Sequence, residues 1–118
     1  MKYMLLVYLN EQAMTDEERA HCYVESAQLT QDLHADGQYI SASPLHPVAT
    51  ATSVRVREGK RLVTDGPFAE TREQLGGYYV VEANDLDEAI SIAERVPPVK
   101  YGTIEIRPVM EIEGLPEN

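Results

Sequence analysis

The chain has 118 residues, 43% of them hydrophobic, which fits one small domain with a single core. Its 20 acidic against 10 basic residues give a formal net charge of −10, which would repel a phosphate backbone and excludes nucleic acid as an expected partner. The single cysteine, Cys22, excludes an intrachain disulfide and a zinc site built from several thiolates, and favours a reducing cytoplasm. The longest apolar run, residues 3–9, is too short to span a membrane, so we expect no membrane association.

The first part of the chain predicts a strand, a long helix and a second strand. Residues 2–9 form a short aliphatic and aromatic run that is apolar on both faces. Thr15-Asp16-Glu17-Glu18 has the form of a capping box and predicts a helix that runs to about Asp36 and ends at Gly37. One stripe of this helix is expected to face inward: Cys22, Ser26, Leu29 and Leu33. Residues 38–42 predict the second strand.

The second part predicts a hairpin, a strand, a short helix and a final strand. Residues 53–57 alternate strictly and the pattern resumes at 61–64, which indicates a hairpin with its turn at Gly59. Residues 78–83 predict a strand, and residues 103–112 predict the last one, followed by a frayed tail at 113–118. The short helix between them opens with a capping sequence at Asp85, and its expected inward residues are Leu86, Ala89, Ile90, Ala93 and Val96.

This order of elements fits a single α+β domain over residues 1–112, with a ferredoxin-like antiparallel sheet and two helices on one face. Two helices cover only one face, yet the first strand is apolar on both faces and residues 78–81 add Tyr-Tyr-Val-Val. A standard interface removes about 800 Å² per partner from water, and two-fold symmetry is the commonest arrangement. We therefore expect a homodimer that packs sheet on sheet.

The most specific signal lies at residues 65–79, DGPFAETREQLGGYY. Gly66 and Pro67 predict a rigid turn, and Phe68 is expected to anchor the loop in the core or at the dimer interface. Together with the opening MKYMLL, residues 50–55 (TATSVR) and residues 104–108 (IEIRP), this stretch closely resembles the DGPF-domain proteins, a branch of the YCII-related superfamily. The resemblance covers nearly the whole chain, and it implies a dimeric α/β-barrel type of ferredoxin-like fold.

The resemblance also has implications for activity. Members of the branch are small bacterial proteins, often encoded beside extracytoplasmic-function sigma factors. Relatives in the wider superfamily have been proposed to use a His–Asp pair, with the His on the long helix and the Asp just after the second helix. Aligned through residues 33–37, the His position falls on Ser26 and the Asp position falls near Val96. Because neither residue is retained, the pair is not transferred to this chain.

Two residues are the candidates for proton transfer. Asp65 could act as a general base, or it could cap its own loop as an Asx turn. His46 lies on a loop between two prolines, and histidine is the side chain most often used for proton transfer. The alternative is that His46 is an ordinary solvated loop residue. His21 and His34 are expected at the surface of the long helix.

Four residues are the candidates for substrate binding: Arg55, Tyr8, Phe68 and Tyr79. Arg55 could bind an anionic substrate, or it could pair across the dimer interface with Glu70, Glu73 or Glu82. Tyr8 and Tyr79, with Tyr78, could line a pocket for an aromatic substrate, or they could pack in the core or interface. Cys22 has no basic neighbour other than His21, so an inert thiol is favoured over a nucleophile.

The sequence contains no phosphate-binding glycine motif, nucleophile elbow or metal-binding repeat, so no cofactor and no metal are expected. The first hypothesis is a bacterial enzyme that acts without a cofactor on a small organic molecule, in a cleft formed by the DGPF loop, the His46 loop and the sheet. The alternative is a non-enzymatic protein that binds a small molecule or a regulatory partner such as a sigma factor.

Overall fold

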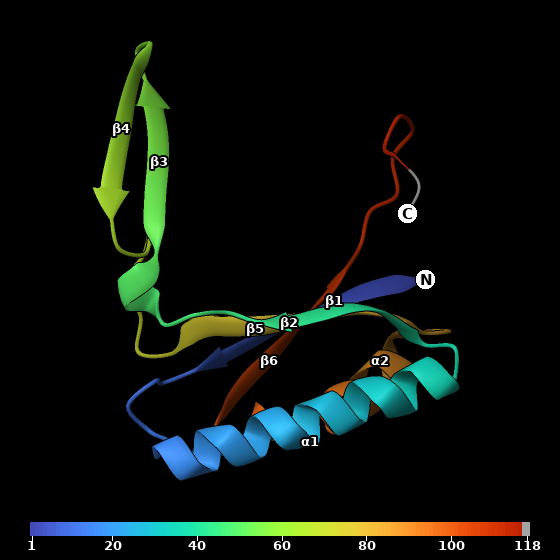
Figure 1. The fold of residues 1–118 in the computed structure, drawn as a ribbon. Coiled ribbons are helices and arrows are strands. Elements are labelled where there is room, and N and C mark those ends of the chain that lie inside the picture. Colours follow the sequence, from blue (N-terminus) through green and yellow to red (C-terminus); the bar gives the residue numbers. More distant parts are fainter. Residues whose placement is uncertain (117–118) are drawn as a thin grey trace.

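The computed structural model describes residues 1–116, and its strands form one main sheet and a separate hairpin. The main sheet is antiparallel in the order β2-β5-β1-β6, and helices α1 and α2 lie on one of its faces (Figure 1). The elements are β1 (Lys2–Leu9), α1 (Asp16–Ala35), β2 (Tyr39–Pro44), β3 (Thr52–Arg57), β4 (Lys60–Asp65), β5 (Gln74–Glu82), α2 (Leu86–Ala93) and β6 (Gly102–Pro108). This arrangement confirms the α+β ferredoxin-like fold. The β3–β4 hairpin is an insertion in the chain between β2 and β5, and it forms a separate two-stranded sheet.

The core lies between the sheet and the two helices. Alternate residues of β1 and β5 face the helices, among them Leu5 and Val81, and they pack around Leu33 of α1. The predicted stripe of α1 is confirmed: Cys22, Leu29 and Leu33 are buried and Ser26 is half-buried.

The predicted inward face of α2 is only partly right. Leu86 and Ile90 are exposed, whereas Ile92 is buried beside Ala89 and Ala93. The inward residues, together with Val96, follow the three-and-four spacing of one helix face. Ile90 lies a third of a turn away from that face, and Leu86 occupies the first position of the helix.

The hairpin and the C-terminal segment both rise from the sheet face opposite the helices. The hairpin turn is confirmed: Glu58 and Gly59 have φ values of 53° and 75°, the left-handed pair that a two-residue turn requires. Figure 1 shows the hairpin at one end of this face and the chain after β6 at the other.

The last strand is shorter than predicted, because β6 ends at Pro108 instead of residue 112. Pro108 pairs with Tyr3, and the Val109 N–H donates to the carbonyl of Lys2, which begins β1. Beyond Val109 the neighbouring strand has ended, so residues 110–112 have no ladder to join. Of the predicted frayed tail, residues 117 and 118 lie outside the described part.

The sheet face between the hairpin and the C-terminal segment, called here the open face, has an apolar centre. Its central side chains are half-buried and belong to β1 and β5: Met4, Leu6, Tyr8, Tyr78 and Val80. The side chain of Tyr79 lies on the opposite face of the sheet, between the sheet and α1. Within residues 1–116, no helix covers the open face (Figure 1).

The capping box of α1 gives the first prediction. The Glu18 N–H donates to Thr15 Oγ1 at 3.1 Å, and the Thr15 N–H donates to Glu18 Oε1 at 3.0 Å. Thr15→Ala should therefore lower the free energy of unfolding by about 1 kcal/mol, as measured by urea denaturation.

The same box makes stability depend on pH. Hydrogen bonds from the backbone and side chain of Thr15 lower the pKa of Glu18 below its ordinary value of 4.5. The stabilisation of the folded state by ionised Glu18 is therefore present above pH 4.5 and is lost as the pH falls through the lowered folded-state pKa. Thr15→Ala should consequently lose less stability on acidification than the unmodified chain does. Thr30→Ala, a threonine change in mid-helix, is the control; an equal effect of both variants on the acid profile would contradict the assignment.

Candidate functional site

A cleft of about 730 Å³ lies between α1 and the sheet. Its walls come from β1, the β1–α1 loop, one face of α1, β2 with the loop that follows it, and β5. Much of the lining is apolar, including Val7, Leu9, Met14 and Ala42. This size and lining are typical of pockets that bind small organic molecules.

Tyr79 and Ser26 provide hydroxyl groups inside the cleft. Tyr79 reaches it from β5, where the residue pairs with Leu5 and Ala42, and Ser26 faces it from α1. Burial raises the pKa of the Tyr79 phenol, and the nearby hydroxyl of Ser26 lowers this pKa by a smaller amount. Tyr79 is therefore a neutral phenol at pH 7 and can donate a hydrogen bond to a ligand oxygen.

Cys22 also lines the cleft, one turn before Ser26 on α1. Burial raises the pKa of the Cys22 thiol, and the negative charge of Glu25 raises it further. The side chain is consequently a protonated, weakly nucleophilic thiol at neutral pH. This agrees with the inert thiol expected from the sequence.

A hydrogen-bonded network around Glu11 joins several segments of the cleft wall. Glu11 Oε2 accepts from the Val48 N–H at 3.0 Å, and the Glu11 N–H donates to Gln74 Oε1 at 3.2 Å. Arg19 donates to the Glu11 carbonyl at 2.8 Å from the first turns of α1. These bonds join the β1–α1 loop to the segment after β2, to β5 and to α1, so they fix this part of the cleft wall.

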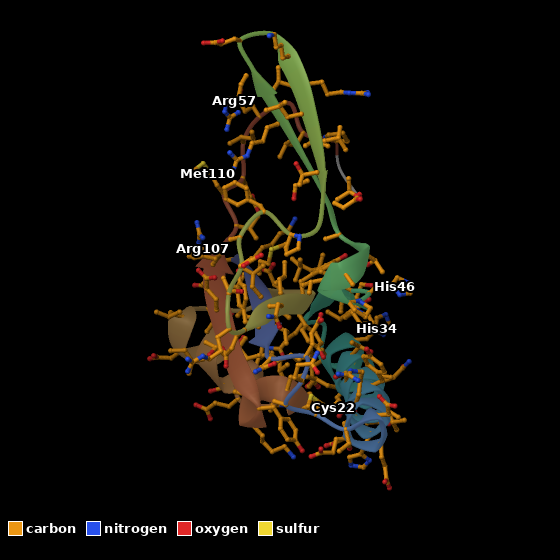
Figure 2. All side chains as sticks on the ribbon, turned by 90° about the vertical axis from the view of Figure 1, so that its left-hand side faces the viewer. Cys22, His34, His46, Arg57, Arg107 and Met110 are labelled. Atoms are coloured by element: carbon orange, nitrogen blue, oxygen red, sulfur yellow. The ribbon has the colours of Figure 1, made fainter. Side chains whose placement is uncertain are left out.

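Two of the predicted site residues lie at or near this cleft. Tyr79 lines it directly. His46 is exposed on the loop after β2, and its neighbours Leu45 and Pro47 line the cleft. Figure 2 shows His46 at the base of the hairpin, apart from Cys22 on α1. His21 and His34 are exposed on α1, as predicted.

The other predicted site residues lie away from the cleft. Tyr8 is on the open face, and Arg55 lies on β3 with its guanidinium carbon 4.6 Å from the centre of the Phe68 ring. Phe68 is 73% exposed, so the prediction of a core anchor is wrong, while an interface role stays a prediction. Arg55 forms no ion pair with a glutamate in residues 1–116, and its pairing across an interface also stays a prediction.

Asp65 ends β4 opposite Thr52, and none of the hydrogen bonds within residues 1–116 uses its carboxylate, so the predicted Asx turn is not formed there. The neighbouring Gly66 has the left-handed φ of 104° that the turn requires. One chain alone does not bring Asp65, Arg55 and Phe68 to the same cleft as Tyr79.

Sequence analysis missed Glu11 and Arg19 and gave Ser26 no ligand role. Glu11 and Arg19 flank the capping box of α1 and read as ordinary polar residues at a helix start. The sequence predicts Ser26 to be an inward residue of the long helix and to stand at the position of an absent histidine, but a serine in a helix carries no signal for ligand binding. Their common location depends on how α1 crosses the sheet, which no local pattern encodes.

Within residues 1–116, no three His, Cys, Asp or Glu side chains gather as a metal ion would require. None of the helices in the described chain is both long enough and apolar enough to cross a membrane.

Comparison with known proteins agrees with this architecture. The family model of the YCII-related domain matches residues 1–113. Uncharacterized protein R00369 of Rhizobium meliloti (strain 1021) is 36% identical over 118 residues, covering 92% of each chain. Among solved structures, the 5-chloro-2-hydroxyhydroquinone dehydrochlorinase TftG of Burkholderia phenoliruptrix AC1100, in complex with 2,5-dihydroxybenzoquinone, superposes with a TM-score of 0.58 at 14% identity, covering 96% of this chain and 97% of the other. The domain match, the relative of similar length and the shared fold lead to one conclusion: the chain belongs to the YCII-related domain family.

Proposed function

We propose that the cleft between α1 and the sheet binds a small ring compound bearing oxygen substituents, and that the protein is an enzyme that acts on this compound without a cofactor. The observation that carries the proposal is a cleft of molecular size, largely apolar, with the neutral phenol of Tyr79 inside it. An apolar wall suits the ring of such a ligand, and a buried hydrogen-bond donor suits its oxygen.

In this proposal Tyr79 donates a hydrogen bond to a carbonyl or hydroxyl oxygen of the ligand, and the Ser26 hydroxyl lines the same cleft. A neutral donor in a site shielded from water stabilises negative charge that develops on that oxygen. His46, beside the cleft-lining Leu45 and Pro47, is the proposed acceptor of a ligand proton. Asp65 and Arg55 stay candidates only for a site that a second copy completes.

A non-enzymatic binding protein is the second candidate, and one observation favours it. The two positions that would hold the superfamily's proposed His–Asp pair are Ser26 and the neighbourhood of Val96, and Val96 is fully buried in the core. Neither the His nor the Asp of that pair is retained. A protein of this kind could bind a small-molecule ligand without catalysing a reaction. It could also bind a basic regulatory partner, such as a sigma factor, through its acidic surface.

Assembly is part of the proposal. A second copy would cover the apolar centre of the open face, which no helix covers in residues 1–116. The single free thiol suits a reducing cytoplasm, which is the proposed location.

The ligand site is tested with 2,5-dihydroxybenzoquinone, the compound bound in the TftG structure, as the probe. Calorimetric titration of the unmodified chain should show saturable binding, and Tyr79→Phe should weaken the affinity about tenfold, since one hydrogen bond is lost. Tyr3→Phe is the matched control: Tyr3 is equally buried but lies outside the cleft, so its variant should bind normally.

Equal affinity of the Tyr79 and Tyr3 variants, or no binding by the unmodified chain, would contradict the proposed site. Absorbance of the probe, followed over hours, then separates the two candidate functions. Conversion of many equivalents indicates an enzyme, whereas stoichiometric binding without conversion indicates a binding protein.

A further inference from the structure

The β3–β4 hairpin, called here the arm (residues 52–65), has a charge opposite to that of the rest of the chain. It carries four of the ten basic residues, Arg55, Arg57, Lys60 and Arg61, and only two of the twenty acidic ones, Glu58 and Asp65. The remaining residues therefore contain six basic and eighteen acidic side chains. None of the four basic groups of the arm forms an ion pair within residues 1–116.

The arm also has unpaired strand edges. β3 and β4 hydrogen-bond only to each other, so each leaves one edge open. Along β3 the sequence Val54-Arg55-Val56-Arg57 places exposed valines on one face and arginines on the other. An exposed edge with alternating apolar side chains is a template for a further strand.

The C-terminal segment, residues 109–113, has the complementary pattern. Its sequence Met110-Glu111-Ile112-Glu113 alternates apolar and acidic residues, and Met110 is 80% exposed. After the bond from the Val109 N–H to Lys2, no backbone hydrogen bond joins Met110, Glu111 or Ile112 to another of residues 1–116. The segment thus offers free donors and acceptors together with negative charge.

Paired with β3 residue for residue, this segment would place Met110 and Ile112 on the valine face and both glutamates beside arginines. Opposite charges and apolar side chains that face each other across neighbouring strands both stabilise a sheet. The arm and the segment of one chain stand at opposite ends of the open face (Figure 1), and Figure 2 shows Arg57 and Met110 clear of the helices. A chain therefore does not pair its own arm with its own segment.

We propose that the C-terminal segment of one copy adds as a third strand to the arm of a second copy, and that two-fold symmetry repeats this exchange on the other side. The inference rests on the two-copy assembly proposed above and is independent of the ligand cleft. Strand addition supplies main-chain hydrogen bonds, and the Arg–Glu alternation fixes the register.

Charge reversal on the two surfaces tests the exchange. The arm variant, R55E with R57E, and the segment variant, E111R with E113R, should each raise the dimer dissociation constant at least tenfold in sedimentation equilibrium without ligand. An equimolar mixture of the two should recover the affinity of the unmodified chain. In the mixed dimer, the one reversed arm meets the one reversed segment, and the other arm and segment keep their native charges.

The control is Arg95→Glu with Lys100→Glu, which makes the same change in net charge as the arm variant, at exposed positions after α2, and should leave the dissociation constant unchanged. If the unmodified chain dimerises but neither variant weakens the dimer, or if the mixture does not recover affinity, the proposed strand exchange is wrong, while the proposed homodimer is retained. A monomeric unmodified chain would overturn both proposals about assembly, and the ligand titration would be unaffected.

Discussion

Alanine at Gly102 is expected to lower the free energy of unfolding by about 3 kcal/mol or more, at the upper end of the cost of overpacking. Gly102 begins β6 directly opposite Leu9 of β1. A Cβ atom there would overlap the carbonyl oxygen of Tyr8 and would lie 2.9 Å from the Cα of Leu9. Because both neighbours are backbone, relief requires the two strands to separate and lose ladder hydrogen bonds. Guanidinium denaturation followed by circular dichroism measures the change.

Gly76→Ala is the matched control, because it adds the same methyl group at the other side of Leu9. Its Cβ would lie 3.7 Å from the Leu9 side chain, which is an ordinary contact. This variant should therefore remain within about 1 kcal/mol of the unmodified chain, the usual range for a strand glycine that has room. Similar stabilities for the two variants would show that β1 and β6 do not approach each other as closely as described.

Leu33→Ala is expected to cost about 2–5 kcal/mol, the range for deleting a leucine side chain in a packed core. Leu33 is 0% exposed and packs in the core cluster with Leu5 and Val81, at the centre of the only layer that joins α1 to the sheet in residues 1–116. The measured quantity is the unfolding free energy from urea titration, with an m-value that shows whether unfolding stays cooperative.

Val24→Ala serves as the comparison on the same helix. Val24 is 70% exposed, so little buried area is lost, and alanine favours the helix slightly more than valine does. A change within about 0.5 kcal/mol is expected. If Val24→Ala cost as much as Leu33→Ala, α1 would be packed on a different face from the one described.

The sequence allowed the fold to be predicted where the signals were local. Thr15 and Glu18 cap α1 as the Thr-x-x-Glu spacing indicated, and Glu58-Gly59 forms the hairpin turn. The end of β6 could not be predicted, because the alternating residues up to 112 look like a strand and only the start of β1 at Lys2 decides where pairing stops. The inward face of α2 failed for a similar reason: every candidate residue was apolar, and the sheet selects among them.

The candidate site was harder to predict than the fold. The most distinctive residues of the sequence, Asp65 to Phe68, predict a site at the loop after the hairpin, whereas the cleft lies between α1 and the sheet. Tyr79 was proposed because it is aromatic, and alternation along β5 then decides that Tyr79, and not Tyr78, faces α1. Ser26 joins it only because α1 crosses β5, which is a tertiary contact.

The surroundings of Ser26 and Val96 also determine how easily a histidine–carboxylate pair could arise on this scaffold. Ser26 is half-buried beside a phenol, so an imidazole there would find a hydrogen-bonding partner and access to the cleft. Val96 is enclosed by core side chains, and a carboxylate in its place would lose its hydration without gaining a partner. The two substitutions therefore differ in cost. A histidine at position 26 is compatible with the present packing, whereas a carboxylate at position 96 becomes tolerable only after a basic group lies close enough to form an ion pair with it.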